Sequence, residues 1–301
     1  MALSDNVTSV LTVSIQTSIQ SHVDSFPPTM RRVADVILER PQIVMENTIS
    51  ELARACDTSE ASIVRFCRAL GFTGYPQLKL QLAAELAKES AEFGGNGDAA
   101  YGADISPSDT LAEMVAKIAG SEILGIRETA DSLDMEVLQR VIRRLERAKR
   151  VVLFGVGASN AGAQDLAQKL LRIGHVALAF HDAHDALVSA ALVEQGDVAI
   201  GFSHNGRTRE TLAFLSAARR NGAHTVAVTN VPDSPLAEQA ESVLRTAVRE
   251  TTFRSGAMAS RIAQLTIIDY LFVGVARGRY DRTVQALKST YEIVKELRDD
   301  S

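Results

Sequence analysis

The residues best suited to bind a small anion form one polar hexapeptide, Ser203-His204-Asn205-Gly206-Arg207-Thr208. It follows an apolar, strand-like run at 198–202 and precedes a helix-like run at 209–220. Hydroxyl, amide and backbone N–H groups would therefore meet where a helix begins, and a helix start carries unpaired N–H groups and about half a positive charge. Such a loop is a natural seat for a phosphate. The alternative is an ordinary turn in which a Ser or Thr only caps the helix.

A second polar loop, Gly155-Val156-Gly157-Ala158-Ser159, follows the apolar run at 151–154. Its glycines let the backbone turn tightly and approach a ligand. Ser159 could bind the same anion, cap the next helix, or do both. A dinucleotide-binding loop is the alternative, with Asp182 as the ribose-binding acid, but that fingerprint requires glycine where Asn160 stands.

Three histidines, His181, His184 and His204, fall in loops that are expected at the strand ends. A metal site built from them is conceivable, but their spacing matches no metal-binding signature, so we expect no metal and no cofactor. The backbone N–H of His204, rather than its ring, is expected to face the anion.

The elements that must position these loops alternate between strand and helix patterns. Strand-like runs lie at 151–154, 176–180, 198–202, 225–228 and 243–246, each followed by a helix-like segment. This alternation predicts a parallel sheet covered by helices on both faces and joined by right-handed crossovers. Ligands of such folds bind at the carboxyl ends of the strands, which is where both polar loops lie.

The first 90 residues are helical in pattern and include a helix-turn-helix arrangement. Thr48 and Glu51 have the spacing of a capping box at the start of a helix over 49–56. A polar turn at 57–60 follows, and a second helix runs to Leu70.

The second helix of this pair has an apolar and a polar face. At ~100° per residue, one face carries Ile63, Phe66, Cys67 and Leu70, and the other carries Ala61, Ser62, Arg65 and Arg68. Small residues and guanidinium groups suit entry into a DNA major groove. The residues expected to contact DNA are Ser59, Ser62, Arg65, Arg68 and Lys79. The alternative is a small helical bundle with solvated arginines.

Composition limits the class of protein. A chain of 301 residues, 46% hydrophobic and 23% charged, has room for two ordinary globular domains. With a formal net charge of -5, DNA binding would depend on a local basic face and on dimerisation. Cys56 and Cys67 lie in apolar helical patterns and are expected to be buried free thiols. No leader pattern or run of ~18 apolar residues occurs, so we expect a cytoplasmic protein without a membrane partner.

The motifs together resemble one known family. The segment from Ser62 to Phe72, with Gly74-Tyr75 and Leu78-Lys79-Leu80, resembles the helix-turn-helix signature of the RpiR/MurR family of bacterial transcription regulators. Four further segments resemble the family's sugar-isomerase (SIS) domain: 155–159, 203–208, 234–237 and 254–261. The implied fold is α/β: an all-α helix-turn-helix domain at 1–90, a linker at 91–108, a three-layer α/β/α SIS domain with a parallel sheet at 109–280, and a C-terminal helix at 281–301.

The resemblance implies a regulator of sugar or amino-sugar metabolism that binds operator DNA, senses a phosphorylated sugar and needs no catalysis. It also implies a homodimer or homotetramer. The implied effector contacts are Ser159, Asn160, Ser203, His204, Asn205, Thr208 and Glu250. Glu250 would reach the sugar, where isomerases use such a residue as a base, or it is simply an exposed loop carboxylate. The alternative function is a phosphosugar isomerase with an accessory helical domain.

Two positions depart from the family pattern. The family's loop commonly reads Ser-x-Ser-Gly-x-Thr, and Asn205 replaces its second serine. Asn160 stands where a small hydroxyl residue is frequent. Both departures bear on which effector binds.

Two more helices are predicted outside these motifs. Ser106 is expected to cap a helix that begins at Pro107. The C-terminal helix, at about 281–297, carries an apolar stripe that must be buried on its own domain or on a partner. The stripe consists of Val284, Leu287, Tyr291, Val294 and Leu297, or Ile293 in place of the last, and we favour contacts within an oligomer.

Overall fold

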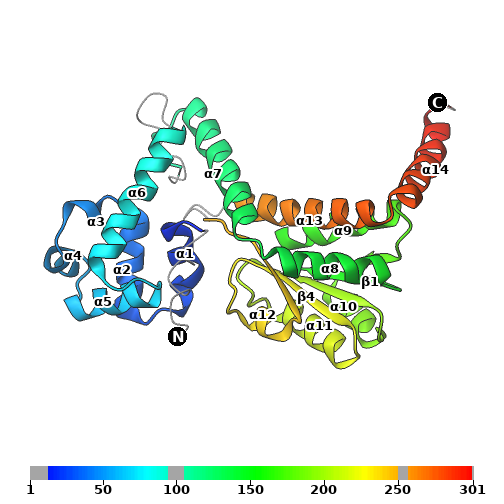
Figure 1. Cartoon of the computed structure of the whole chain (residues 1–301), viewed down its shortest axis with the longest axis horizontal. Coiled ribbons are helices and arrows are strands. Elements are labelled where there is room, and N and C mark those ends of the chain that lie inside the picture. The colour runs from blue at the N-terminus through cyan, green and yellow to red at the C-terminus, as the bar shows by residue number, and fades with distance from the viewer. Residues whose placement is uncertain (1–12, 94–104, 250–256, 300–301) are drawn as a thin grey trace, which may run out of the picture. The chain divides into compact units, whose positions relative to one another are not determined.

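The computed structural model describes residues 13–93, 105–249 and 257–299. Contacts divide the chain into two compact units (Figure 1). The helical unit comprises Met1–Asp131 with Ala247–Ser255, and the sheet unit comprises Ser132–Thr246 with Gly256–Ser301. The domain boundaries at 90, 108 and 280 stay a prediction, and most of the predicted linker, 94–104, lies outside the described residues.

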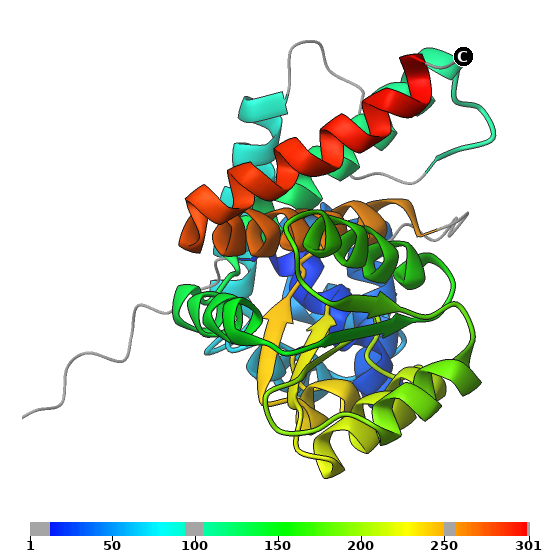
Figure 2. The ribbon, with the colours of Figure 1, turned by 90° about the vertical axis from the view of Figure 1, so that its right-hand side faces the viewer.

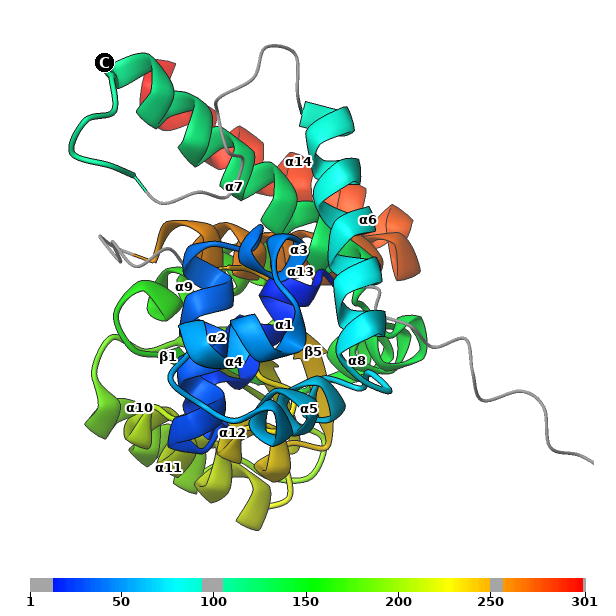
Figure 3. The same cartoon turned by 90° about the vertical axis from the view of Figure 1, so that its left-hand side faces the viewer.

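Helices α1 to α7 form the helical unit (Figure 3). Their bounds are α1 Ile15–His22, α2 Pro28–Glu39, α3 Ile43–Glu46, α4 Ile49–Ala55, α5 Glu60–Ala69, α6 Tyr75–Phe93 and α7 Leu111–Asp131, with a short turn, η1, at Val23–Ser25. The apolar faces of α1 to α6 share one core, centred on fully buried side chains such as Ile37, Leu52 and Phe66. This core holds the helix-turn-helix pair, α4 and α5, against α2 and α6.

The predicted helix-turn-helix is confirmed. The Thr48 hydroxyl accepts a hydrogen bond from the N–H of Glu51 at 3.3 Å, and the Glu51 carboxylate accepts one from the N–H of Thr48 at 2.8 Å. This capping box starts α4. Asp57 adopts a left-handed φ of 46° in the turn, and α5 ends before Gly71, whose φ is 85°. The polar turn therefore joins two short helices as the sequence predicted.

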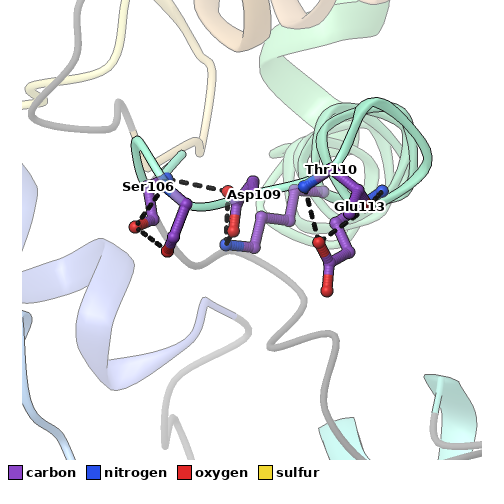
Figure 4. A network of polar contacts seen from close by, with 6 residues as sticks. Ser106, Asp109, Thr110 and Glu113 are labelled. Carbon is purple, nitrogen blue, oxygen red and sulfur yellow. Dashed lines mark hydrogen bonds and ion pairs between the residues drawn. The ribbon is translucent and has the colours of Figure 1, made fainter.

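The predicted helix start at Ser106 is wrong, because α7 begins at Leu111 (Figure 4). The Asp109 carboxylate accepts the N–H of Ser106 at 2.7 Å and closes a turn there instead. Thr110 and Glu113 then form the actual cap: the N–H of Thr110 donates to the Glu113 carboxylate at 2.6 Å, and the N–H of Glu113 donates to the Thr110 hydroxyl at 3.3 Å. A reciprocal capping pair satisfies two backbone N–H groups, which a lone serine cap cannot do.

The sheet unit contains five parallel strands and the helices that connect them. The strands are β1 Val151–Gly155, β2 Ala177–Ala179, β3 Val198–Phe202, β4 His224–Thr229 and β5 Ser242–Arg245, in the order β2-β1-β3-β4-β5. The helices are α8 Met135–Arg147, α9 Ala158–Arg172, α10 Ala183–Ala191, α11 Arg209–Arg220, α12 Pro235–Gln239, α13 Met258–Gly278 and α14 Tyr280–Asp299. All five predicted strands and the parallel sheet are confirmed.

The sheet lies between two helical layers (Figure 2). One face packs on α8, α9 and α13, and the other on α10, α11 and α12. Among the described helices, α13 alone is long and apolar enough to span a membrane. Its side chains Ile267, Ile268 and Leu271 are instead buried in the core on the sheet. The three-layer α/β/α prediction is therefore confirmed, and the apolar composition of α13 serves the core.

Candidate functional site

The two polar loops leave the sheet at the point where its strand order reverses. β1 and β3 are neighbours, and Gly155 at the end of β1 pairs with Phe202 at the end of β3. The chain leaves β1 toward β2 on one side and leaves β3 toward β4 on the other. Such a switch point opens a crevice at the carboxyl ends of the strands, which is the usual ligand site of open α/β sheets.

The Ser203–Thr208 loop folds so that its polar side chains converge. The Ser203 side chain is buried, at 2% exposed, and its hydroxyl oxygen lies 2.9 Å from that of Thr208. The Ser203 hydroxyl also donates to Asn205 Oδ1 at 3.3 Å, and Asn205 Oδ1 accepts the N–H of Arg207 at 3.0 Å. Two hydroxyls and one amide thus gather within a single loop.

Thr208 precedes the first residue of α11 but makes no side-chain capping bond to it. Its hydroxyl contacts Ser203 instead. The alternative in which this threonine only caps the helix is therefore not what the structure shows. The unpaired N–H groups and partial positive charge at the start of α11 remain directed at the loop.

Gly206 makes this loop conformation possible. Its φ is 64°, and a Cβ built there would lie 2.0 Å from the hydroxyl oxygen of Ser234. Its carbonyl accepts the N–H of Leu236 at 3.1 Å. The loop is therefore packed tightly on the start of α12, and no side chain larger than hydrogen fits at this position.

The first loop contributes Ser159 and Asn160. The Ser159 hydroxyl accepts a hydrogen bond at 3.1 Å from Nε2 of Gln264, a buried α13 residue. Asn160 Nδ2 donates to the carbonyls of Gly155 at 2.9 Å and of Phe180 at 2.5 Å. The amide nitrogen of Asn160 thus ties together the chain segments that leave β1 and β2. Its contact with an effector stays a prediction.

Gln264 is the site residue that sequence reasoning missed. It is 2% exposed and positions Ser159 from a helix that is distant in sequence. The signal that could have found it is its spacing, three and four residues before Ile267 and Ile268, which places a polar residue on the apolar face of this helix. Glu250, the predicted contact to the sugar, lies outside the described residues.

Candidate DNA contacts lie on and near α5. Arg65 and Arg68 are exposed, as the wheel predicted. Ser59 is the N-cap of α5, and its hydroxyl accepts the N–H of Ser62 at 3.3 Å. The Lys79 ammonium donates to the carbonyl of Asn47 at 3.0 Å, so it also braces the end of α3.

The expectation that Ser62 lies on the outer face is wrong, because its side chain is 2% exposed. It stands one turn before Phe66 and shares that buried edge of the helix. Its hydroxyl lies 3.1 Å from that of Ser59 and accepts a hydrogen bond from Arg65 Nη2 at 3.1 Å. Ser62 therefore positions Arg65 rather than presenting its own hydroxyl.

Comparison with known proteins covers both units. Residues 13–89 match the helix-turn-helix domain of the rpiR family, and residues 144–274 match the SIS domain. An HTH-type transcriptional regulator of Caldanaerobacter subterraneus subsp. tengcongensis is 39% identical over 92% of this chain and 95% of its own length. The regulator YbbH of Bacillus subtilis is 34% identical over 93% of this chain and 96% of its own.

A solved structure resembles most of the chain. The Vibrio vulnificus NanR protein, complexed with ManNAc-6P, is 31% identical and has a TM-score of 0.59. The match covers 94% of this chain and 99% of the NanR chain. The fold is therefore shared with the NanR protein over most of the chain.

Proposed function

We propose that this chain, which belongs to the RpiR family of helix-turn-helix transcriptional regulators, binds a sugar phosphate in its SIS domain and changes its affinity for operator DNA in response. The observation that carries the proposal is the convergence of Ser203, Asn205 and Thr208 at the switch point of the sheet. A regulator that responds to a metabolite needs such a site in addition to its DNA-binding helices.

The chemistry of the loop suits a phosphate. The donors that converge in it are hydroxyls, an amide and backbone N–H groups at the start of α11, all without formal charge, whereas the Arg207 side chain is exposed. Neutral donors at a helix start favour an anion while allowing its release when the concentration falls. A typical coupling between two sites, ~1–3 kcal/mol, would change DNA affinity about 5- to 150-fold.

The effector is proposed to be a hexose or amino-sugar phosphate. The NanR protein, whose structure was solved with ManNAc-6P, is similar along nearly the whole chain and supports this class. Asn205 departs from the common second serine of the loop, so the preferred sugar phosphate is expected to differ from those of relatives that keep the serine. Ser159, held by Gln264, is proposed as a further contact.

The DNA contacts are proposed to come from Arg65 and Arg68, whose side chains are exposed on α5. Ser59 is expected to add a contact at the start of α5, and Lys79 stays a weaker candidate because its ammonium already binds the carbonyl of Asn47. We also propose a homodimer or homotetramer, supported by Tyr291 and Ile293, which are exposed on α14. A second copy would bury these side chains and double the number of DNA contacts.

The second candidate is a phosphosugar isomerase, since a phosphate loop alone serves either function. The helix-turn-helix favours the regulator, because an isomerase has no use for exposed arginines on α5. We propose that the chain has no catalytic role. A coupled assay of aldose–ketose conversion tests this, and turnover that disappears in Glu250→Gln would establish the enzyme instead.

The test of the regulator combines two measurements on the full chain. Calorimetry with glucose 6-phosphate, ManNAc-6P and ribose 5-phosphate, beside the same sugars without phosphate, should show binding of a phosphorylated sugar only. Fluorescence anisotropy of an operator duplex, chosen from the DNA upstream of the protein's own gene, should then change on adding that sugar phosphate. Equal binding of plain and phosphorylated sugars would remove the phosphate from the proposal, and an unchanged DNA affinity would remove the regulation.

A further inference from the structure

Arg249 is the centre of a polar cluster buried within the helical unit. Its Nε donates to the Thr17 hydroxyl at 3.1 Å, and its Nη2 donates to the Ser14 hydroxyl at 2.9 Å. Nη2 also lies 3.4 Å from a carboxylate oxygen of Glu128 and 3.7 Å from one of Glu85. Ser14 caps α1, Thr17 is on α1, Glu85 is on α6 and Glu128 is on α7, so one guanidinium joins three helices.

The buried carboxylates of this cluster and the Arg249 guanidinium stabilise one another's charged forms. The side chains of Arg249, Glu85 and Glu128 are 11%, 13% and 8% exposed. Carboxylates that are this well buried need a cation or several donors near them, because desolvation disfavours the charged form. A second oxygen of Glu85 accepts the N–H of Ile15 at 2.6 Å, and one of Glu128 accepts the Thr17 hydroxyl. Movement of Arg249 would therefore disturb the contacts of α1, α6 and α7 together.

The residues just before Arg249 hold the same segment against α7. The N–H of Ala247 donates to the Thr129 hydroxyl at 3.0 Å. A Cβ built on Gly125 would lie only 2.7 Å from a methyl carbon of Val248, so the backbone of α7 approaches this segment closely. Residues 247–249 are thus anchored to the helical unit by backbone, apolar and ionic contacts.

The residue that precedes this segment belongs to the sheet unit and is tied to the candidate phosphate loop. The N–H of Thr246 donates to the carbonyl of Thr229 at 3.0 Å, and its hydroxyl donates to Asn230 Oδ1 at 3.4 Å. The carbonyl of His204, inside the loop, accepts the N–H of Asn230 at 2.9 Å and the Thr229 hydroxyl at 3.1 Å. Two hydrogen-bonded steps therefore connect the loop to Thr246.

From these contacts we infer that residues 246–249 couple the phosphate loop to the helical unit that carries α4 and α5, with Arg249 as the anchor in that unit. The inference rests on the proposed function and specifies its regulation. The peptide bond from Thr246 to Ala247 joins the two sets of contacts directly. A residue spans at most ~3.6 Å, so a segment fixed at both ends by such contacts has little slack. A shift of the His204 carbonyl when a phosphate enters the loop is passed to Arg249 rather than absorbed.

Arg249 is a positioning residue in this scheme, so its test measures coupling rather than binding alone. The variants Arg249→Gln and Thr129→Val are compared with the parent chain. Each is assayed by calorimetry with glucose 6-phosphate, ManNAc-6P and ribose 5-phosphate, and by anisotropy of the operator duplex with and without these sugars. The quantity compared is the ratio of the DNA dissociation constants with and without sugar phosphate.

A matched control removes an arginine from another buried carboxylate. Arg150 Nη2 lies 2.6 Å from Asp197, whose side chain is fully buried, at the amino ends of β1 and β3. Arg150→Gln therefore breaks a comparable ion pair at the edge of the sheet opposite the phosphate loop. It should lower the melting temperature while leaving the ratio of DNA affinities near that of the parent.

We expect Arg249→Gln to bind both the sugar phosphate and DNA. Its DNA dissociation constants with and without sugar phosphate should agree within about twofold. Thr129→Val, which keeps the side-chain volume, should also bring the ratio of DNA dissociation constants closer to one. This variant serves as the test if Arg249→Gln does not fold. The inference is overturned if both variants keep the ratio of the parent chain, or if Arg150→Gln loses the DNA response as fully as Arg249→Gln does. The proposed function stands in either case. A parent chain that binds no sugar phosphate, or binds one without a change in DNA affinity, overturns the proposed function itself.

Discussion

The hydroxyl oxygens of Ser203 and Thr208 lie 2.9 Å apart, across the loop that joins β3 to α11. The Ser203 hydroxyl donates to Asn205 Oδ1, so the Thr208 hydroxyl donates to that of Ser203, at the start of a helix whose first N–H groups have no intrahelical partner. An entering phosphate oxygen can replace these acceptors and accept from both hydroxyls. The pair therefore forms part of the proposed phosphate site, and its hydrogen bond is made without a ligand.

Removal of both hydroxyls, in Ser203→Ala with Thr208→Ala, should abolish the effector response. A hydrogen bond to a charged group contributes ~1.5–3 kcal/mol, so two such bonds correspond to a loss of about 100-fold or more in sugar-phosphate affinity. Calorimetry measures the loss, and anisotropy should show DNA binding without effector unchanged. Ser216→Ala on α11, away from the loop, serves as the control. Parent-like affinity in the double variant would contradict the assignment of the loop.

Substitution of Arg65 and Arg68 by alanine should weaken operator binding and leave the fold intact. Both side chains are exposed on α5, so their loss creates no cavity. Each lost base or phosphate contact should cost about 1–3 kcal/mol, and loss of a phosphate contact lowers the salt dependence of binding. Anisotropy across a salt series measures both effects. Arg220→Ala on α11 is the control and should bind DNA like the parent. If the Arg65 and Arg68 double variant binds the operator as tightly as the parent, α5 does not contact the DNA through these arginines.

Gly206→Ala should disrupt the effector site more than a matched glycine substitution elsewhere. Gly206 and Gly174 both have positive φ values, 64° and 84°, so backbone strain should make alanine unfavourable by a similar ~1–2 kcal/mol at each position. Only at Gly206 does the new Cβ meet another atom, the Ser234 hydroxyl oxygen at 2.0 Å. We expect sugar-phosphate binding to be lost in Gly206→Ala and kept in Gly174→Ala. Similar calorimetric affinities in the two variants would show that the packing of this loop is unimportant.

Neither cysteine should react with a thiol reagent in the native protein. Cys56 and Cys67 are buried, and burial raises the pKa of both thiols, that of Cys67 to about 11. The thiolate is the reactive form, and at pH 7 about one Cys67 in ten thousand would carry it. A colorimetric thiol titration should therefore give two equivalents only after denaturation. Rapid reaction of the native chain would mean that the core around α4 and α5 opens readily.

Stability should decrease as the pH falls below about 6.5. Burial lowers the pKa of His224 in the folded state, with Arg144 and Arg140 acting in the same direction and Glu241 opposing them. The unfolded state, with an ordinary histidine pKa of ~6.5, therefore binds more protons, and protonation favours unfolding. His175 acts in the same direction, because burial lowers its pKa as well.

The melting temperature measured from pH 7.5 to 5.5 checks this expectation. His224→Gln should flatten the decrease, since glutamine has no proton to bind. It can also keep a polar contact to Glu241 or Ser242, which lie 3.0 and 3.2 Å from the two ring nitrogens. An identical pH dependence in His224→Gln and the parent would show that this histidine does not contribute.

Local patterns in the sequence were sufficient for the helix-turn-helix pair and for the five strands of the parallel sheet, but not for the start of α7. The capping box at Thr48, the two-helix pattern around it and the five apolar runs depend on residues a few positions apart. The loop at Ser203 could be predicted because a polar hexapeptide between a strand and a helix must lie at the carboxyl end of the sheet. The resemblance of the same motifs to a known family then predicted the order of the two units.

Other features depended on contacts between distant segments, and only the tertiary structure decided them. Ser62, which the helical wheel assigned to the polar face, is buried because it shares an edge of α5 with Phe66. The bond from Gln264 to Ser159 spans 105 residues, and that from Arg249 to Ser14 spans 235. Periodicity and capping act within a few residues, whereas such partners are chosen by which segments the folded core brings together. The sequence by itself therefore determined the strands, the helix-turn-helix pair and the position of the Ser203–Thr208 loop, and the fold decided which distant side chains contact one another.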